Sequence, residues 1–273
     1  MIKQAIIPLA GMGTRLLPLT SVLPKELLPI NGKPGLEYIL DECIEAGIKE
    51  VIFIISNKKL IIKKYFYNDN YFKKIIKSKK KDKRLKLEYA KIKKYKKMIK
   101  FVYQNTPRGT GDAVLKCEKF IKDKNFLMLL PDDLIIKTNC SKAIIKIHNL
   151  NKASVIASKK VSKKDVSRWG IFKIKKIDNK NFYIKDVVEK PTIKNAPSNF
   201  AVIGRYVLSS DIFKVLKKQT PGQNGEIHIT DAIKSLIKSK KKFLGHVFDG
   251  KYLDCGTMKG YINSSIEISK SKL

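Results

Sequence analysis

The sequence has 273 residues and a formal net charge of +34 at pH 7, with 58 Lys and Arg residues against 24 Asp and Glu. This length suits one large α/β domain, and because no stretch of about eighteen apolar residues occurs, we expect no transmembrane helix. The charge by itself would favour a nucleic-acid partner, but Arg stands at only five positions and the lysines are spread along the chain. Lys lacks the bidentate geometry of base readers, so the charge indicates a solvated surface and no specific nucleic-acid partner.

Cysteine usage indicates a reducing compartment. The four cysteines, Cys43, Cys117, Cys140 and Cys255, are scattered without a Cys-x-x-Cys pair. This spacing is typical of neither a disulfide framework nor a zinc site. The first residues carry one Lys and a short apolar run that leads directly into a glycine loop, so they indicate a strand rather than a signal peptide. We therefore expect a cytoplasmic protein.

A short apolar run at residues 5–8 predicts a buried first strand, and a glycine-rich loop follows it. Glycines let a backbone approach a ligand and present N–H groups, and two cations suit a polyphosphate. A dinucleotide fingerprint is disfavoured because Leu16 stands where its third glycine belongs, and no Gly-Lys-Ser/Thr follows for a Walker loop. The glycines and cations alone are also compatible with a plain strand-to-loop turn. The loop residues of interest are Gly11, Gly13, Thr14, Arg15 and Lys25.

The next segments predict a βαβ unit with helices outside it. Apolar spacing over residues 36–44 predicts a helix that ends at Gly47, and residues 51–55 predict a buried strand. Residues 58–100 are rich in Lys and predict surface helices with a loop near residues 78–82. Strand character resumes over residues 98–104.

A second glycine motif follows that strand, where residues 104–113 read Gln-Asn-Thr-Pro-Arg-Gly-Thr-Gly-Asp-Ala. The amide of Gln104 offers an acceptor and a donor side by side, which can pair with O4 and N3–H of uracil. Gly109 and Gly111 would admit a base against the backbone. A polar loop that caps a helix at residues 113–117 is the alternative. Beside the first glycine loop, the motif favours a nucleobase pocket.

Two acidic residues stand at the end of the following strand. Residues 125–130 predict that strand, and Pro-Asp-Asp follows at residues 131–133. Open α/β sheets bind ligands at the carboxyl ends of their strands, and a carboxylate there can hold a hard cation against phosphate oxygens. Adjacent acidic residues also form ordinary turns, so both interpretations stay open at this point.

The second half of the chain predicts a β-rich region. Strands are expected near residues 153–161, 167–172 and 182–184, and a turn at residues 178–181 makes a hairpin. Alternation around Asp249-Gly250 within residues 243–252 predicts another hairpin. A short helix is expected over residues 259–268.

The first loop carries a more specific signature than its glycines alone. Residues 11–18 read Gly-Met-Gly-Thr-Arg-Leu-Leu-Pro, and residues 24–29 read Pro-Lys-Glu-Leu-Leu-Pro. This resembles the sugar-nucleotide pyrophosphorylase signature, Gly-x-Gly-Thr-Arg-x-x-Pro followed by Pro-Lys-x-x-x-Pro. Ala10 and the Lys-Glu pair are similar to the bacterial UTP–glucose-1-phosphate uridylyltransferases, whereas relatives that make dTDP-glucose tend to carry Gly-Gly and Lys-Gln. Later matches extend the resemblance from Lys3 to about Tyr261.

The resemblance implies an α/β fold, a Rossmann-like α/β/α nucleotidyltransferase with a mostly parallel mixed sheet and a smaller, sugar-binding β-rich region. Residues 1–273 would form a single nucleotidyltransferase domain. Residues 1–160 would be mainly the nucleotide-binding half, and residues 161–273 mainly the sugar-phosphate-binding half with the C-terminal helix. A homo-oligomer, either a dimer or a tetramer, is implied as well.

The resemblance also assigns roles to individual residues through motifs at residues 169–170, 187–191, 201–206 and 253–257. Asp133 would be a neighbour of the metal site or a helix-capping group. The catalytic cations would be Arg15, Lys25 and Lys190. The nucleotide would contact Leu9, Ala10, Gly11, Gly13, Thr14, Gln104 and Gly109. The sugar phosphate would contact Gly170, Glu189, Lys190 and Ala201. Mg²⁺ would bind Asp132 and Asp254.

The implied reaction converts UTP and glucose 1-phosphate into UDP-glucose and pyrophosphate by in-line attack of the sugar phosphate on the α-phosphorus. Positioning and cations would lower the barrier without a covalent protein nucleophile. Gln104 can reject cytosine and purines, but thymine adds only a methyl group, so a dTTP-using glucose-1-phosphate thymidylyltransferase stays open as the alternative enzyme. From another class, the alternative is a basic nucleic-acid-binding protein on the same fold.

Overall fold

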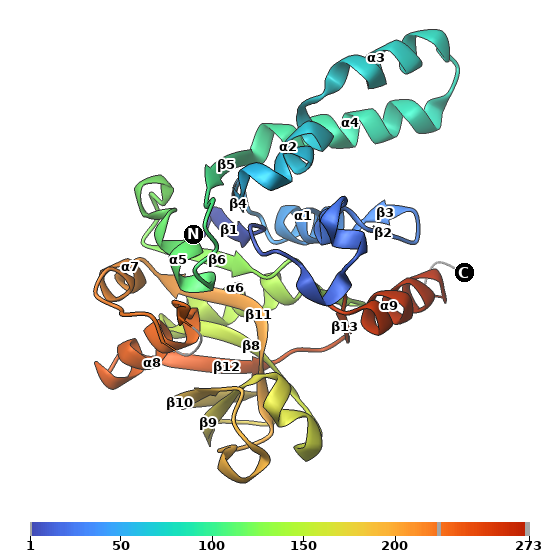
Figure 1. Ribbon diagram of the computed structural model, residues 1–273. Coiled ribbons are helices and arrows are strands. Elements are labelled where there is room, and N and C mark those ends of the chain that lie inside the picture. Colours follow the sequence, from blue (N-terminus) through green and yellow to red (C-terminus); the bar gives the residue numbers. More distant parts are fainter. Residues whose placement is uncertain (1, 223–224, 271–273) are drawn as a thin grey trace.

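The computed structural model describes residues 2–222 and 225–270, and these residues form a nine-stranded mixed sheet in the order β5-β4-β1-β6-β11-β8-β12-β10-β9 (Figure 1). A second pairing joins β11 to β9. The strands of this sheet are β1 Gln4–Pro8, β4 Glu50–Ile55, β5 Ile99–Tyr103, β6 Asn125–Leu129, β8 Ser154–Lys160, β9 Gly170–Lys176, β10 Asn181–Glu189, β11 Phe200–Ser209 and β12 Phe243–Val247. Two small antiparallel sheets pair β2 Pro29–Ile30 with β3 Lys33–Pro34, and β7 Asp133–Ile136 with β13 Lys251–Asp254.

The N-terminal half of the large sheet is parallel. β1 lies between β4 and β6, and β5 pairs with the outer edge of β4. Their continuous apolar runs are explained by burial on both faces, which parallel strands generally require. Because parallel strands end at one edge, the loop after β1 and the acidic pair after β6 come together there.

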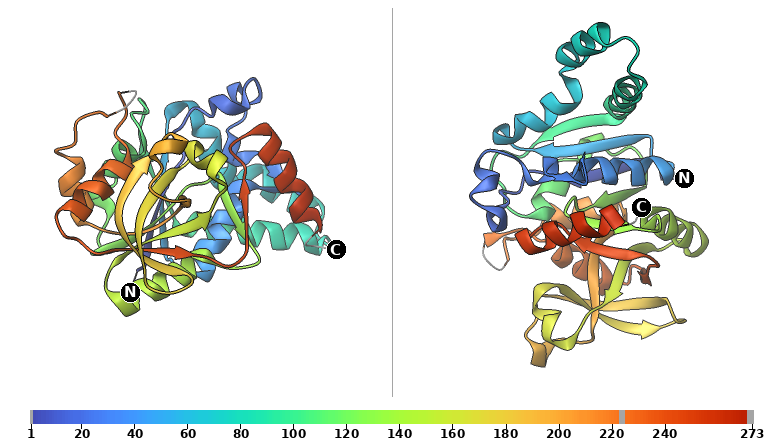
Figure 2. Two further views of the ribbon diagram at one scale, coloured as in Figure 1. Left: turned by 90° about the horizontal axis from the view of Figure 1, so that it is seen from below. Right: turned by 90° about the vertical axis from the view of Figure 1, so that its right-hand side faces the viewer.

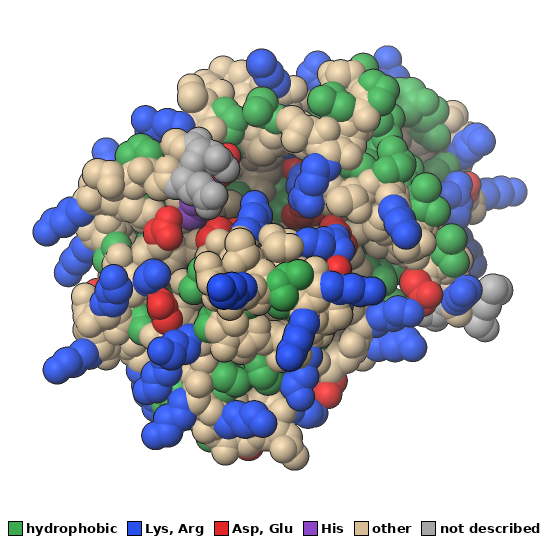
Figure 3. Space-filling view, turned by 60° about the horizontal axis from the view of Figure 1, so that its bottom comes forward, with side chains coloured by type: hydrophobic (Ala, Val, Ile, Leu, Met, Phe, Trp, Pro, Cys, Tyr) green, Lys and Arg blue, Asp and Glu red, His purple; other side chains and the backbone are tan. Residues whose placement is uncertain are grey.

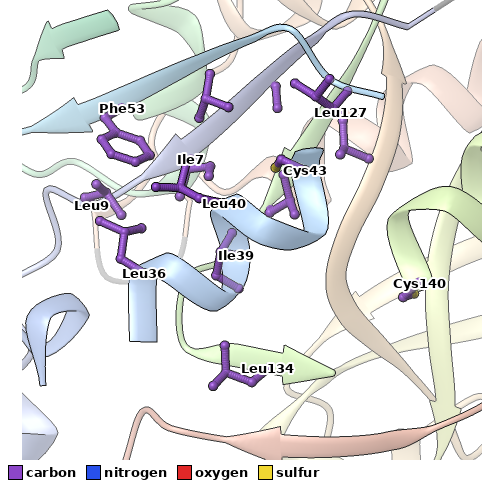
Figure 4. Packing of buried hydrophobic residues seen from close by; sticks show 14 of the residues in the cluster. Ile7, Leu9, Leu36, Ile39, Leu40, Cys43, Phe53, Leu127, Leu134 and Cys140 are labelled. Carbon is purple, nitrogen blue, oxygen red and sulfur yellow. The ribbon is translucent and has the colours of Figure 1, made fainter. Parts of the chain in front are cut away.

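Helices cover both faces of the sheet. On one face, α1 Gly35–Glu45 turns Leu36, Leu40 and Cys43 toward Ile7 and Phe53, as Figure 4 shows. These helical positions recur every three or four residues, so one stripe of α1 faces the strands. The opposite face is covered by α5 Thr110–Leu115, α7 Asp211–Leu216 and α8 Ile229–Lys238. The remaining helices are α2 Leu60–Tyr67, α3 Asp69–Ser78, α4 Lys83–Met98, α6 Cys140–Asn151 and α9 Met258–Lys270.

The predicted surface helices form an arm. α3 and α4 run side by side away from the sheet, as Figures 1 and 2 show. Phe72 stacks on Tyr89 with ring centroids 5.4 Å apart, which joins the two helices. Asp82 caps α4 by accepting a hydrogen bond from the Leu85 amide at 3.0 Å. The expectation of helices with a loop near residues 78–82 is confirmed.

The predicted β-rich region is a hairpin at the far end of the sheet. β9 and β10 pair antiparallel across a turn in which Asp178 accepts from the amides of Lys180 and Asn181, each at 2.7 Å. β10 also pairs with β12, so the hairpin extends the large sheet. Within the described residues, the expected mixed sheet with a smaller β-rich region is confirmed. The sheet is not mostly parallel as expected, because four of its strand pairings are parallel and five are antiparallel.

The hairpin predicted over residues 243–252 is wrong. β12 pairs with β8 and β10, whereas β13 pairs with β7 in a separate sheet. Gly250 has φ +104° and lies so close to β7 that a Cβ there would stand 2.5 Å from the Ile136 carbonyl oxygen. The Asp249-Gly250 turn therefore carries the chain from one sheet to another instead of folding it back.

In the described residues, no helix has the length and apolar character needed to cross a membrane.

Candidate active site

A cleft of about 490 Å³ opens at the carboxyl edge of the parallel strands and continues into a second cavity of about 770 Å³. The face seen in Figure 3 is hollowed near its centre, where acidic and basic side chains lie together. Of the candidates, the two cavities share Thr14, Arg15, Asp132, Glu189 and Lys190. The first cavity adds Ala10, Gly11, Gly13, Lys25, Gln104 and Gly109. The second adds Gly170 and Asp254.

The glycine loop folds into three short 3-10 turns, at Thr14–Leu16, Leu19–Ser21 and Lys25–Leu27. Gly13 has φ +70°, a conformation that favours glycine, and its carbonyl accepts a hydrogen bond from the Thr20 hydroxyl at 2.9 Å. The loop thereby curls back on itself and leaves Thr14 and Arg15 exposed. Leu9 lies at its start and is fully buried, so the side chain of this candidate faces the core.

Two cations of the loop meet one carboxylate. The Lys25 ammonium lies 2.6 Å from Asp132 Oδ2, and the Arg15 guanidinium lies 3.5 Å from the same oxygen. Burial disfavours the charged form of Lys25, but Asp132 and Glu26 outweigh it and hold the pKa of Lys25 above its ordinary value. Burial likewise works against ionisation of Asp132, yet Lys25 and Arg15 hold the pKa of that carboxyl below its ordinary value. The group at this point is a carboxylate with adjacent cations.

Asp133 has other hydrogen-bond partners than Asp132. Its carboxylate accepts hydrogen bonds from the Gly204 amide at 2.8 Å and from the Tyr252 hydroxyl at 2.6 Å. Burial and the adjacent Asp132 charge raise the pKa of Asp133 to about 6. Of the two roles expected for Asp133, helix capping is wrong, because Asn139 caps the following helix and Asp133 begins β7. The other role, a neighbour of Asp132 at the metal site, stays a prediction. Asp133 ties three strands together at the wall of the second cavity.

Asp254 comes to Asp132 from the opposite end of the chain. The Cys255 amide donates to the Asp132 carbonyl at 2.8 Å, and the Gly256 amide donates to Asp254 Oδ1 at 2.9 Å. A Cβ on Gly256 would stand 2.7 Å from Asp132 Oδ2, 2.8 Å from the Arg15 guanidinium and 3.2 Å from Asp254 Oδ1. Gly256 therefore leaves space where two carboxylates and a cation converge.

This pair of carboxylates fits a hard divalent cation. Among residues 2–222 and 225–270, no group of three or more His, Cys, Asp or Glu could hold a metal ion. Mg²⁺ commonly binds through one or two carboxylates and completes its shell with water and substrate phosphates. Asp132 and Asp254 are two carboxylates of the kind that such a shell uses, and both line the second cavity.

The proposed nucleobase side is organised around a buried acid that the sequence-based assignment left out. Gln104 donates through Nε2 to Asp112 Oδ2 at 2.6 Å, and Arg108 donates to Asp112 Oδ1 at 2.9 Å. Asp112 thus fixes the amide of Gln104 at the cleft wall, and its place in the Gly-x-Gly-Asp motif was the available signal. Gly109 has φ +98°, and a Cβ there would stand 2.6 Å from the Ile227 carbonyl oxygen.

Gly111 has a different purpose from the one expected. Its amide donates to the Ile227 carbonyl at 2.7 Å, and a Cβ would press on that carbonyl at 2.8 Å and on Leu216 at 2.9 Å. The glycine admits a neighbouring chain segment, so the prediction that it admits the base is wrong. That segment brings Thr230 to the cleft wall, another residue that the sequence-based assignment omitted.

The proposed sugar side lies where β9 meets β10 and β11. A Cβ on Gly170 would stand 3.0 Å from Val202 and 3.2 Å from the Glu189 carboxylate, so glycine leaves that carboxylate room. Lys190 has φ +43°, and its amide donates to the Trp169 carbonyl at 3.0 Å. Such a conformation is costly for a residue with a side chain and persists where surrounding structure imposes it, often at functional sites.

Ala201 is not brought to the cleft. It is fully buried against Val166 and Ile171, and its carbonyl accepts from the Ser158 hydroxyl at 2.9 Å. Its strand neighbours Val202, Gly204 and Tyr206 line the second cavity instead. Alternation along β11 explains this difference, since residues of one strand face opposite sides in turn.

Comparisons with known proteins agree with this geometry. A family model described as nucleotidyl transferase matches residues 4–271, and the chain belongs to that family. Within it, the chain is 38% identical over 274 residues to a UTP–glucose-1-phosphate uridylyltransferase of Streptococcus pyogenes, covering 97% of this chain and 88% of the relative.

Solved structures place the resemblance in the same branch. A UDP-glucose pyrophosphorylase complexed with UDP-glucose has a TM-score of 0.86 and 35% identity, covering 99% of this chain and 100% of that one. The UTP-bound enzyme of Acinetobacter baumannii has a TM-score of 0.89 and 32% identity, covering 98% and 93%. A Bacillus anthracis protein named as a putative glucose-1-phosphate thymidylyltransferase, at 21% identity and a TM-score of 0.76, shares the fold. The resemblance to the uridylyltransferase branch of the family is confirmed.

Proposed function

We propose that this chain catalyses the transfer of a uridylyl group from UTP to glucose 1-phosphate, with UDP-glucose and pyrophosphate as products. The observation that carries the proposal is the meeting of Lys25, Arg15, Asp132 and Asp254 in one cleft between Gln104 and Glu189. The relatives named as uridylyltransferases and the solved structures with UTP and UDP-glucose support the same reaction.

In the proposed reaction, an oxygen of the sugar phosphate forms a bond to the α-phosphorus while the bond from that phosphorus to the β-phosphate breaks. Attack by one anion on another is opposed electrostatically, so cations and alignment supply the catalysis. Lys25 would hold the triphosphate, the exposed Arg15 the departing pyrophosphate, and Lys190 the incoming sugar phosphate. No side chain needs to form a covalent intermediate.

Enzymes of this family generally use a divalent metal, and we propose Mg²⁺ between Asp132 and Asp254. The ion would neutralise phosphate oxygens and hold them in line for the transfer. Lys25 and Arg15 already compensate Asp132 in the structure, so these side chains would turn toward phosphate oxygens when nucleotide and metal enter.

We propose that Gln104 reads the base, because Asp112 holds its amide at the cleft wall. A uracil edge offers one acceptor and one donor to that amide. A thymine base differs by one methyl group, which a pocket discriminates by about 10–200-fold. The proposed preference is for UTP, and the solved structure named as a putative thymidylyltransferase, at 21% identity, supports the shared fold alone.

The two halves of the chain would divide the substrates, residues 1–160 serving the nucleotide and residues 161–273 the sugar phosphate, within a single domain. Asp254 would be the exception, since it joins Asp132 at the metal.

We further propose a cytoplasmic homo-oligomer, a dimer or a tetramer, without a specific nucleic-acid partner. The four free, buried cysteines support a reducing compartment.

The test is a matrix of nucleoside triphosphates and sugar 1-phosphates in which pyrophosphate release is measured with and without Mg²⁺. We expect the highest kcat/KM for UTP with glucose 1-phosphate, and little release without a divalent cation. Equal or better use of dTTP would make the chain a thymidylyltransferase. Absence of release from every pair would reject the enzymatic proposal.

A further inference from the structure

Lys59 is a buried lysine that neither the signature nor the cleft includes. It ends a 3-10 turn, Asn57–Lys59, that follows β4, and the residue is only 7% exposed. Its ammonium donates to the Leu9 carbonyl at 2.7 Å and to the two carboxylate oxygens of Glu26 at 2.8 and 2.9 Å. An ammonium has three N–H donors, so these acceptors use all of them.

The two partners of Lys59 stand at opposite ends of the glycine loop. Leu9 ends the β1 side of the loop, and its amide donates to the Ile54 carbonyl at 2.7 Å. Glu26 is 3% exposed and immediately follows Lys25, whose ammonium contacts Asp132. Lys59 therefore links the backbone beside Ala10 and Gly11 to the turn that carries the triphosphate cation.

A buried ion pair of this kind is weak evidence for stability. Desolvating two charges costs several kcal/mol per ion, and apolar replacements of such pairs are often neutral or stabilising. A role in positioning the backbone explains the pair better, because the third hydrogen bond of Lys59 goes to the Leu9 carbonyl at the start of the glycine loop and not to another charge.

We propose that Lys59 is a positioning residue that fixes the distance between the nucleobase end of the glycine loop and Lys25. This inference rests on the proposed nucleotidyl transfer. Lys59 acts through Leu9 and Glu26 and does not touch substrate. Losing it would let the two ends of the loop shift independently, so that a bound base would no longer bring the α-phosphate into line with Lys25.

The test compares Lys59→Met, Glu26→Gln and the double variant Lys59→Met/Glu26→Gln. Lys59→Met alone leaves Glu26 buried and unpaired, whereas the double variant removes both charges and isolates the lost bond to Leu9. We expect the double variant to keep a melting temperature close to that of the wild type. Its kcat should remain about 10²-fold low, since a displacement near 1 Å can cost that much.

The KM for glucose 1-phosphate should be unchanged in the double variant, because Lys59 does not bond to β10, β11 or the Glu189–Lys190 segment. Glu26→Gln, which leaves Lys59 bonded to Leu9, should lose less activity than either variant that lacks Lys59. The matched control is Lys33→Met/Asp41→Asn, which removes another partly buried ion pair, between the β3 strand and α1. That control should keep kcat.

Double-variant activity within about threefold of the wild type would mean that Lys59 only neutralises Glu26, and would overturn the inference. A double variant that cannot fold would overturn it as well, because the pair would then hold the fold. The proposed function fails separately, if the wild-type chain itself forms no UDP-glucose.

Discussion

Asp132 and Asp133 are adjacent in sequence and serve different partners. Asp132 contacts Lys25 and Arg15, whereas Asp133 accepts hydrogen bonds from Gly204 and Tyr252. Their surroundings move the two pKa values in opposite directions, downward for Asp132 and upward for Asp133. The position of an acidic pair at a strand end was predictable from the sequence. The family resemblance assigned the metal role to Asp132. The partners of Asp133, Gly204 and Tyr252, come from strands far along the chain and were not predictable from the local pattern.

Lys25→Ala removes the cation closest to Asp132. We expect kcat to fall by at least about 10²-fold, the usual size for losing one electrostatic partner of a transition state. Steady-state pyrophosphate release measures it, with circular dichroism to show that the variant folds. The control is Lys100→Ala, which breaks a surface pair between Lys100 on β5 and Glu50 on β4, and its kcat should be unaffected. Near-normal turnover of a folded Lys25→Ala protein would remove Lys25 from the mechanism.

Gln104→Ala removes the amide that we propose reads the base. The preference for UTP over CTP should fall at least about tenfold, equivalent to about 1.4 kcal/mol, because no side chain then distinguishes the pairing edges. Relative kcat/KM for the two nucleotides measures the change, and the KM for glucose 1-phosphate serves as internal control. An unchanged ratio would place base selection elsewhere in the cleft.

Elements were predicted well where the local pattern and the final environment agree. The β1-loop-α1-β4 unit follows from apolar runs, a helical stripe and Gly47, which has φ +86°. The failure at β13 has the opposite cause. Asp249-Gly250 is a good local hairpin signal, but the partner of β13 is β7, a four-residue strand more than one hundred positions upstream. The residues of a turn predict that the chain bends there, but they do not predict which strand β13 pairs with.

At the β10–β12 junction, His246 predicts a pH dependence of stability. Burial, reinforced by Lys180, lowers the pKa of His246 below its ordinary value, and its Nδ1 lies 2.9 Å from Asn181 Oδ1. The unfolded chain binds a proton more readily, so the neutral imidazole favours folding above about pH 6.5, and this contribution is lost as the pH falls below that value.

His246→Gln keeps a hydrogen-bonding group and removes the titration. We expect the melting temperature of the wild type, relative to the variant, to fall between about pH 7.5 and about pH 5.5. Thermal unfolding at matched ionic strength measures it. Parallel pH profiles for the two proteins would show that His246 does not titrate differently in the folded state.

Across the whole molecule, positive charge is widespread and also concentrated on the arm. Lys and Arg side chains are spread over the face in Figure 3, and residues 69–98 alone hold fourteen basic residues against three acidic ones. Attraction to any polyanion at low salt follows from this and decides nothing about function. The cleft, by contrast, is partly enclosed and less screened by salt.

At about 150 mM salt, we expect UDP-glucose to raise the melting temperature and a DNA duplex to leave it unchanged, because nonspecific binding falls steeply with salt. Replacing Lys86, Lys93, Lys94 and Lys97 on α4 by Gln should reduce DNA retention at low salt without altering the shift caused by UDP-glucose. If a DNA duplex stabilises the protein more than UDP-glucose does, the positive charge serves nucleic-acid binding and the proposed enzymatic function is wrong.

The cleft is closed by contacts between distant parts of the chain. Lys25 pairs with Asp132 at 2.6 Å, Arg168 reaches Asp254 at 3.4 Å, and the Tyr261 hydroxyl donates to the Pro29 carbonyl at 2.6 Å. During synthesis, once the growing chain has emerged from the ribosome as far as β8, it already contains the glycine loop, Gln104 and Asp132. Glu189, Lys190 and Asp254 are still unmade at that stage. Incomplete copies of the protein are therefore expected to be inert toward sugar phosphates, and transferase activity arises only as the last strand and α9 join the N-terminal half.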